Sequence, residues 1–264
     1  MSIHVGMDPI LLTLGSTEVR WYGLMVSLAI LTVVGWTYFN VKKAGIPTDV
    51  VYNSALWAIP FGLVTSRLVG VVDRLDYYTD NPGEIYGFSG LTIYGGILGA
   101  TLGVWIYTRF KGQPFGQLAD VAAPGIILAQ AVGRIGCAIN GCCYGTPTTL
   151  PWGFIYTNPN SYAPLGVSTQ PAVVYELLFD LAVFGMLLAV RHRLKASGSL
   201  FLLYLATYSA GRFFFSYLRE NTTYGGLREA QIIAPVVLVV TVPLLVYLLR
   251  RRQSEAVPLK IDDK

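Results

Sequence analysis

Stretches of about 20 mostly apolar residues recur along the chain and constrain its fold more than any other feature. A helix of that length crosses the hydrocarbon core of a bilayer, whereas barrel strands are shorter and alternate in polarity. Because 53% of the residues are hydrophobic and only 13% are charged, a soluble domain is excluded. The sequence therefore predicts an all-α, polytopic integral membrane protein. Its seven predicted transmembrane helices are residues 22–39, 50–72, 91–107, 118–139, 171–190, 200–218 and 232–249.

The basic residues gather in short clusters between these apolar stretches and predict the topology. Most of the 19 Lys and Arg residues fall on one side of the predicted spans. By the positive-inside rule that side is cytoplasmic, so the N-terminus lies outside and the C-terminus in the cytoplasm. Such clustering reports topology, and no nucleic-acid partner is expected despite the net charge of +4. The predicted cytoplasmic side holds Lys42, Lys43, Arg109, Lys111, Arg191, Arg193, Lys195, Arg250, Arg251, Arg252, Lys260 and Lys264.

The spans and their connections predict one integral membrane domain, residues 1–264. Residues 1–20 are expected to form an interfacial lead-in whose leucines rest on the headgroup layer. Residues 140–169, rich in Pro, Asn, Ser and Thr, are too polar to span and are predicted to form an extracytoplasmic loop. Residues 250–264 are predicted to form a cytoplasmic tail. No internal repeat suggests the related halves of a transporter.

Two arginines, Arg134 and Arg212, fall inside predicted spans, where an ionisable residue is costly and usually functional. Two interpretations remain open. The arginines either pair with Glu176 and Asp180, one turn apart in the fifth span, and with backbone carbonyls, or they hold an anionic headgroup, because guanidinium matches phosphate through bidentate hydrogen bonds. The predicted topology places six polar residues near the outer ends of four spans: Tyr22, Tyr94, Arg134, Asn140, Arg212 and Arg219.

Glycines surround this polar set. Gly133 and Gly145 flank Arg134 and Asn140, where they permit either tight helix packing or a sharply turned segment that lines a polar cavity. The glycines of the third span are explained by helix packing alone; they are Gly95, Gly96 and Gly99.

The three cysteines, Cys137, Cys142 and Cys143, all lie at the end of the fourth predicted span. Their spacing is not a zinc pattern, because His4 and His192 are far away in sequence, and no metal site is predicted. A catalytic thiol is disfavoured for the same lack of a nearby histidine. If the following loop is extracytoplasmic, Cys137 can form a disulfide with either of the other two. The sequence leaves disulfide and free thiols open.

Eight short motifs follow one another along almost the whole chain. They are Arg20-Trp21-Tyr22-Gly23-Leu24-Met25, Tyr94-Gly95-Gly96, Gly133-Arg134-Ile135-Gly136, Asn140-Gly141, Gln170-Pro171, Tyr175-Glu176, Gly211-Arg212-Phe213-Phe214 and Leu218-Arg219-Glu220. Together they resemble the bacterial prolipoprotein diacylglyceryl transferase family. The central signature, residues 133–141, combined with the arginine of the sixth span, is the most specific part.

This resemblance implies a multi-pass enzyme of the bacterial inner membrane. It would transfer the diacylglyceryl group of phosphatidylglycerol to the lipobox cysteine thiol in the signal peptide of prolipoproteins, the first step of lipoprotein maturation, and release glycerol phosphate. No metal or organic cofactor is expected. Arg134 and Arg212 would bind the lipid phosphate and, with Tyr94, act in catalysis. The resemblance assigns substrate binding to Tyr22, Gly133, Arg134, Asn140, Gly145, Arg212 and Arg219.

The chain departs from the family pattern at several positions. Tyr94 stands in place of a histidine, and Cys137, Cys142 and Ser216 replace an asparagine, an acidic residue and a glutamate. Either Tyr94 serves as the base that the histidine would supply, or the acceptor thiol ionises beside Arg134. The departures keep two alternatives open: a divergent headgroup transferase with another acceptor, and a membrane protein that binds or translocates lipid without chemistry.

Overall fold

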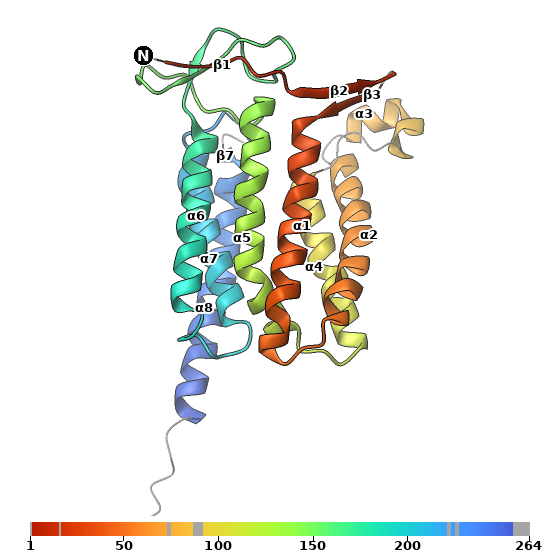
Figure 1. Cartoon of the computed structure of the whole chain (residues 1–264), viewed down its shortest axis with the longest axis vertical. Coiled ribbons are helices and arrows are strands. Elements are labelled where there is room, and N and C mark those ends of the chain that lie inside the picture. Colours follow the sequence, from red (N-terminus) through yellow and green to blue (C-terminus); the bar gives the residue numbers. More distant parts are fainter. Residues whose placement is uncertain are drawn as a thin grey trace, which may run out of the picture. The chain divides into compact units, whose positions relative to one another are not determined.

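The computed structural model describes residues 2–15, 17–72, 75–86, 92–220, 223–224 and 227–255. This part of the chain is mostly helical, with a few short strands (Figure 1). Two helices of 18 residues, α4 (Ile93–Phe110) and α7 (Ser199–Ser216), lie where the third and sixth spans are predicted. Five helices among the described residues are long and apolar enough to cross a membrane, and they coincide with the other five predicted spans: Trp21–Ala44, Asp49–Val72, Phe115–Asn140, Ala172–Val190 and Ala230–Arg251.

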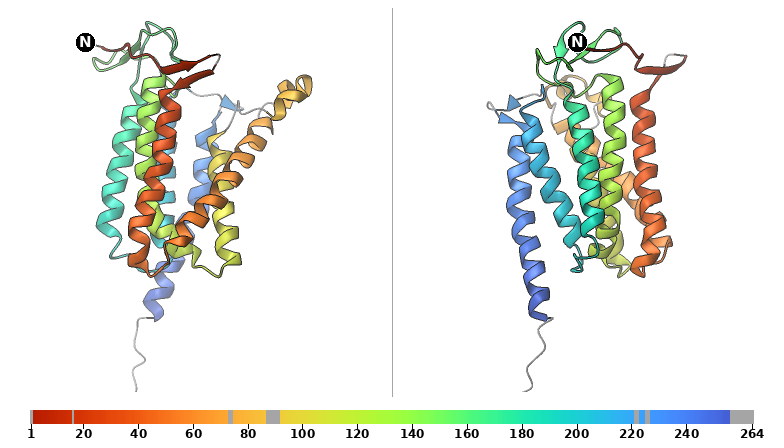
Figure 2. Two further views of the ribbon diagram at one scale, coloured as in Figure 1. Left: turned by 45° about the vertical axis from the view of Figure 1, so that its right-hand side comes forward. Right: turned by 60° about the vertical axis from the view of Figure 1, so that its left-hand side comes forward.

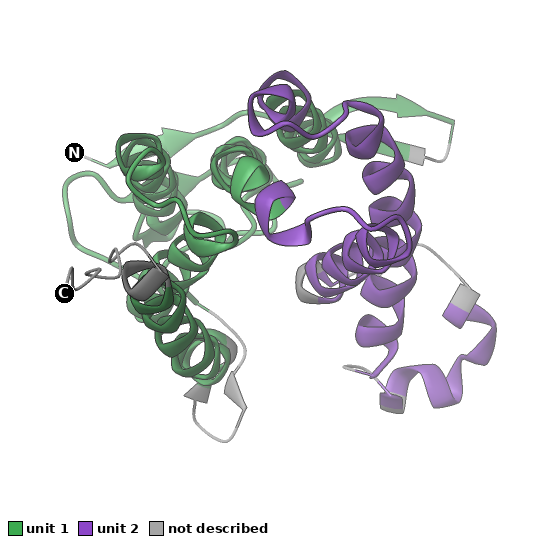
Figure 3. Ribbon diagram, turned by 90° about the horizontal axis from the view of Figure 1, so that it is seen from below, with its two compact units in different colours: residues 1–36, 119–264 green, residues 37–118 purple. Residues whose placement is uncertain are grey.

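The chain divides into two compact units, residues 1–36 with 119–264 and residues 37–118 (Figure 3). The second unit contains η1 (Lys42–Ala44), α2 (Asp49–Val72), α3 (Leu75–Asp80), η2 (Pro82–Tyr86) and α4. The first unit contains β1 (Ile3–Val5), β2 (Ile10–Leu14), β3 (Thr17–Arg20), most of α1 (Trp21–Val41) and of α5 (Phe115–Asn140), β4 (Phe154–Tyr156), β5 (Ser168–Thr169), α6 (Ala172–Val190), α7, β6 (Thr223–Tyr224), β7 (Leu227–Arg228) and α8 (Glu229–Glu255).

In the second unit, α2 and α4 pack with their backbones close together. A Cβ atom added at Gly95 would lie 2.6 Å from the carbonyl oxygen of Thr65, and one at Gly103 would lie 2.7 Å from that of Trp57. Gly99 faces Phe61 in the same way. Small residues at every fourth position let two helices approach this closely in lipid. The prediction that helix packing explains Gly95 and Gly99 is confirmed.

In the first unit, α5, α6 and α7 lie side by side in all the views, and α8 lies against α7 (Figures 1 and 2). Their shared core contains Ile127, Val183 and Leu187, which are almost fully buried. At one end of α7, the carboxylate of Asp120 on α5 accepts hydrogen bonds from the backbone N–H groups of Gly198 and Phe201 at 2.7 and 2.9 Å. These bonds satisfy N–H groups that the first turn of a helix leaves without partners. α5 and α7 are therefore joined by polar as well as apolar contacts.

A small sheet covers one end of these helices (Figure 1). β1 pairs in parallel with β4, with Ile3 opposite Phe154, and β4 pairs antiparallel with β5. β2 and β3 form a separate hairpin. The predicted lead-in and the predicted polar loop therefore contain strands, and the two segments pair with each other. The hydroxyl of Tyr156 donates to the carbonyl of Ala138 at 3.0 Å, which ties the sheet to the end of α5.

Candidate functional site

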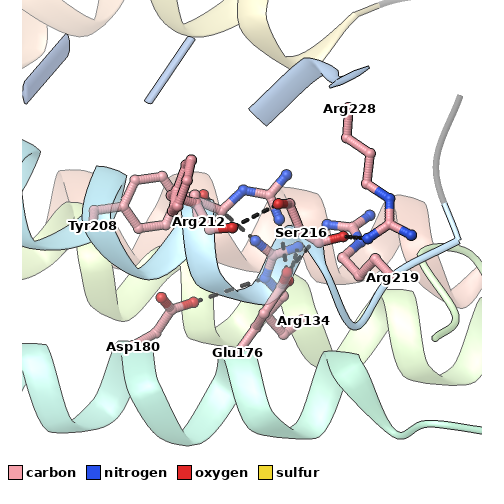
Figure 4. Close-up of polar contacts among 9 residues, drawn as sticks. Arg134, Glu176, Asp180, Tyr208, Arg212, Ser216, Arg219 and Arg228 are labelled. Atoms are coloured by element: carbon pink, nitrogen blue, oxygen red, sulfur yellow. Dashed lines mark hydrogen bonds and ion pairs between the residues drawn. The ribbon is translucent and has the colours of Figure 1, made fainter. Parts of the chain in front are cut away.

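Two acids on α6 form the centre of the candidate site. Glu176 and Asp180 lie one helical turn apart, so their side chains project from the same side of α6. Both are buried, with exposed fractions of 2% and 1%. Figure 4 shows the two carboxyl groups pointing toward the arginines of the neighbouring segments. Because an unpaired buried charge is very costly, carboxylates at this depth need cationic partners.

Arg134 on α5 is the first of these partners. Its Nη1 lies 2.9 Å from Oε2 of Glu176, and its Nε lies 3.8 Å from Oδ2 of Asp180. Its Nη2 donates to the hydroxyl of Tyr208 on α7 at 3.4 Å. The guanidinium therefore touches both acids and the facing helix. Only 11% of its side-chain surface is exposed, so it is held inside the helices of the first unit.

Arg212 and Arg219 reach the same carboxylate from α7 and from the residues that follow it. Nη1 of Arg212 donates to Oε1 of Glu176 at 2.7 Å, and Nη1 of Arg219 donates to the same oxygen at 3.3 Å (Figure 4). Glu176 thus forms ion pairs with three guanidinium groups, two of which also donate hydrogen bonds to Oε1. The sequence alternative in which Arg134 and Arg212 pair with the acids of the fifth predicted span is confirmed.

The position of Arg219 is set by the backbone around it. Arg219 forms a β-bridge with Gly145, and the N–H of Thr146 donates to the carbonyl of Leu218 at 2.9 Å. A Cβ atom at Gly145 would lie 2.8 Å from that same carbonyl oxygen, so a larger residue would push the two segments apart. Gly145 therefore permits the close backbone approach that brings Arg219 to Glu176.

The site carries more positive than negative charge. Three guanidinium groups, Arg134, Arg212 and Arg219, face two carboxylates, which leaves one formal positive charge with both acids ionised. The Nε atom of Arg219 is buried and donates to no atom of the described residues. A buried donor without an acceptor is a costly group that a bound anion would satisfy. The arrangement is suited to an anion such as phosphate.

The sequence profile of the family described as prolipoprotein diacylglyceryl transferase matches residues 9–247. The chain belongs to this family. A phosphatidylglycerol--prolipoprotein diacylglyceryl transferase of Dehalococcoides mccartyi is 42% identical over 253 residues, which cover 95% of this chain and 97% of the relative. The protein of the same name from Clostridioides difficile is 35% identical, with 94% and 98% covered. That from Listeria welshimeri is 33% identical, with 98% and 95% covered. The predicted family membership is confirmed.

Two residues assigned to substrate binding by the family resemblance lie near the first turn of α1 and the end of α5. The side-chain oxygen of Asn140 accepts a hydrogen bond from Nη1 of Arg20 at 3.3 Å, and Asn140 is only 4% exposed. Tyr22 is the second residue of α1, and its backbone packs close to Gly136 of α5. The guanidinium of Arg20 also lies over the ring of Tyr162, 4.6 Å from its centroid. Neither Tyr22 nor Asn140 contacts Glu176 in the contacts described for this part of the chain.

The surroundings of three further positions of the family pattern differ; these are Gly133, Tyr94 and Ser216. A Cβ atom at Gly133 would meet no atom within 4 Å, so the surface of α5 beside Arg134 is open at this point. Tyr94 lies in the first turn of α4, which belongs to the second unit, and its side chain is outside the described residues. Its predicted catalytic role stays a prediction. Ser216, which replaces the glutamate of the family pattern, is fully buried, and its hydroxyl donates to the carbonyl of Phe213 at 2.6 Å.

Sequence reasoning missed two groups beside the arginines. Tyr208 lies four residues before Arg212 on α7, and its hydroxyl accepts from Arg134; its ring stacks on Tyr204, whose hydroxyl donates to Gln130 at 3.2 Å. Helical spacing from Arg212 is the signal that would have found Tyr208. Arg228 of β7 donates to the carbonyl of Ser216. No pattern in the sequence points to that contact, because β7 is only two residues long.

The cysteines also come together. Cys137 is buried in the last turn of α5, and Cys142 and Cys143 follow the end of the helix. All three are free thiols, so the disulfide that the sequence allowed is not formed in this structure. The three Sγ atoms lie within 4.8 Å of one another. The spacing argument against metal binding did not foresee this cluster.

Proposed function

We propose that this protein is a bacterial inner-membrane enzyme that transfers the diacylglyceryl group of phosphatidylglycerol to the lipobox cysteine thiol in the signal peptide of prolipoproteins. This is the first step of lipoprotein maturation. Membership of the transferase family supports the proposal, and the names of the relatives from three bacteria specify both substrates.

The observation that carries the proposal is the convergence of Arg134, Arg212 and Arg219 on Glu176, with its surplus positive charge. In the reaction, the thiolate sulfur forms a bond to a glycerol carbon of the lipid while the bond from that carbon to a phosphate oxygen breaks. Glycerol phosphate leaves with the electron pair. The phosphate group passes from one negative charge in the diester toward two in the leaving group, so guanidiniums bind the transition state more strongly than the ground state.

We assign Arg134 and Arg212 to the phosphate and Arg219 to substrate binding beside them, on the same carboxylate. Each of the three already uses Nη1 on Glu176, which fixes its orientation before the lipid arrives. Because these donors are oriented in advance, no free energy is needed to reorganise them when the reaction occurs. The open surface of α5 at Gly133 offers the approach to Arg134, and Gly145 positions Arg219.

Tyr22 and Asn140 are assigned to the glycerol headgroup. Asn140 is already oriented by its hydrogen bond from Arg20. Tyr94 is assigned to the acceptor thiol: in its tyrosinate form it takes the proton as the thiol becomes a thiolate. The proposed topology has seven transmembrane helices, with the N-terminus outside and the C-terminus in the cytoplasm. A reporter fused to the C-terminus that is active only in the cytoplasm tests this orientation.

The deciding experiment is mass spectrometry of a lipobox peptide incubated with purified protein and phosphatidylglycerol. A diacylglyceryl mass added to the cysteine, with release of one glycerol phosphate per modified peptide, is expected. Arg134→Gln should lower the rate by at least about 100-fold, because removal of one preorganised donor to a developing anion costs that much. Arg109→Gln removes an exposed arginine of α4 and is the matched control, expected to leave the rate unchanged.

Three outcomes would overturn parts of the proposal. Release of glycerol phosphate without peptide modification would replace the peptide by another acceptor. Phospholipid recovered unchanged from active, folded protein would leave only lipid binding. Full activity in Arg134→Gln would remove that residue from the phosphate site.

A further inference from the structure

The proposed transferase reaction assigns no role to the cluster of three cysteines. Its members are Cys137, Cys142 and Cys143, the only cysteines of the chain. Their sulfur atoms all lie within 4.8 Å of one another, and the group contains no histidine or carboxylate among the described residues. In tetrahedral geometry with metal–sulfur bonds of about 2.3 Å, two thiolates on one metal are about 3.8 Å apart. The sulfur atoms need to close by about 1 Å or less to share an ion.

The backbone after α5 is folded to gather these thiols. Gly141 has a φ of 69° and Cys143 has a φ of 63°, so both residues adopt the left-handed conformation. A glycine adopts it freely, but a cysteine does so at a cost. Gly141 also packs against Ser161 and Ala163, which fixes the turn. The turn brings Cys142 and Cys143 back over Cys137, and the thiol of Cys142 lies 3.8 Å from the carbonyl of Cys137.

The thiols lie beside the end of a helix. The cluster is at the C-terminal end of α5, where the helix dipole favours positive charge. Metal binding requires thiolates, so an ion that binds here displaces the thiol protons.

We propose that Cys137, Cys142 and Cys143 form a binding site for one thiophilic metal ion with a filled d shell, either Cu⁺ or Zn²⁺. Thiolates select these soft or borderline ions over Mg²⁺ and Ca²⁺. Three sulfur ligands saturate Cu⁺, whereas Zn²⁺ takes water as a fourth ligand. The ion would fix the turn between α5 and the segment that pairs with Arg219, and it takes no part in the transfer reaction. The proposal does not depend on the proposed function.

The test is a metal titration of the purified, reduced protein under anaerobic conditions. Cu⁺ is supplied from a chromophoric chelator and, in a separate series, Zn²⁺ from a fluorescent indicator. One equivalent of one ion should transfer to the protein, with a sulfur-to-metal charge-transfer band and a higher unfolding temperature. Cys143→Ser removes one of the three ligands and should raise the dissociation constant of the metal at least roughly tenfold. Tyr144→Phe, in the same turn, is the matched control and should bind as the unmodified protein does.

Two results would overturn the proposal. One is a metal stoichiometry equal to that of a variant with all three cysteines replaced by serine, provided that both proteins unfold at similar temperatures. The other is a mass two hydrogens lower in protein purified with reductant, which would identify a disulfide in place of the metal site. Capture of Cu⁺ alone or of Zn²⁺ alone supports the site and identifies its ion.

Discussion

Arg212 and Glu176 are joined by a hydrogen bond of 2.7 Å between Nη1 and Oε1, inside the helices of the first unit. The same carboxylate pairs with Arg134 on α5 and with Arg219 beyond the end of α7. One side chain of α6 therefore connects three segments that are far apart in sequence. Because a buried cation without its partner is costly, the stability of the fold and the charge of the site depend on the same carboxylate.

The first prediction concerns the loss of that charge. Glu176→Gln keeps the size of the side chain but leaves three guanidiniums facing only Asp180. Removing one partner of a buried ion pair costs about 3–5 kcal/mol, so we expect a much lower unfolding temperature in detergent and loss of transferase activity. Asp180→Asn is the comparison, because Asp180 approaches Arg134 only at 3.8 Å and should cost less. Equal stability of Glu176→Gln and the unmodified protein would contradict this account.

The second prediction concerns Asp120, whose carboxylate holds the N–H groups of Gly198 and Phe201 at the start of α7. Asp120→Ala removes both hydrogen bonds and should lower the free energy of unfolding by about 0.5–2 kcal/mol, as for other helix caps. Asp120→Asn keeps one acceptor oxygen and should lose less. Chemical denaturation of the two variants measures the difference. A larger loss in the asparagine variant would mean that the contact does not act as a cap.

The apolar runs predicted the helices well, because length and composition alone determine whether a segment can cross a bilayer. The same argument could not predict the strands. β1 and β4 are far apart in sequence, and the whole second unit lies between them in the chain. The pairing of Ile3 with Phe154 therefore depends on where the intervening helices end. A three-residue strand has too little alternation of polarity to be recognised from sequence.

Much of the candidate site was also visible in the sequence. Arg134, Arg212, Glu176 and Asp180 stand out because charged residues are rare inside spans, and the spacing of the two acids places them on one face of α6. The sequence could not choose between an ion pair and an anion site, and the structure contains the ion pairs with one cation in excess. The cysteine cluster was missed because spacing rules do not include a left-handed turn at Cys143.

The third prediction compares two glycine-to-alanine substitutions beside the arginines. A Cβ atom at Gly211 would lie 3.0 Å or closer to ring atoms of Phe179, whereas one at Gly133 meets no atom within 4 Å. Gly211→Ala should destabilise the protein by about 1–3 kcal/mol through overpacking. Gly133→Ala should be as stable as the unmodified protein or slightly more so, because alanine favours a helix. Thermal unfolding of the pair decides this.

The Gly133→Ala and Gly211→Ala variants also distinguish an effect on stability from an effect on substrate binding. If lipid approaches Arg134 across the open surface at Gly133, then Gly133→Ala should raise KM for phosphatidylglycerol without lowering the unfolding temperature. A double variant with Phe179→Leu should recover part of the stability lost in Gly211→Ala, because the smaller side chain leaves room for the added methyl group. An unchanged KM in Gly133→Ala would place the lipid elsewhere.

The fourth prediction concerns Asp8, which ties the segment before β2 to the predicted polar loop. Its carboxylate accepts from the backbone N–H of Ile10 at 2.9 Å and from the side-chain amide of Asn160 at 3.1 Å. The bond from Ile10, and then that from Asn160, lower the pKa of Asp8 from its ordinary value of 3.8. A lowered pKa means that the ionised group stabilises the fold, so its contribution is complete above pH 3.8 and is lost as the pH falls through the lowered value.

Hydrogen exchange of the β2–β3 hairpin measures this effect. Protection corrected for the intrinsic exchange rate should stay constant above pH 3.8 and decrease below it in the unmodified protein. Asp8→Asn cannot ionise, so its protection should already be lower at neutral pH and should change less with acid. The hydrogen bonds are exposed at the surface, so the effect should be confined to residues near Asp8 rather than spread to the helices. The same acid dependence in both proteins would show that another group controls the opening of the hairpin.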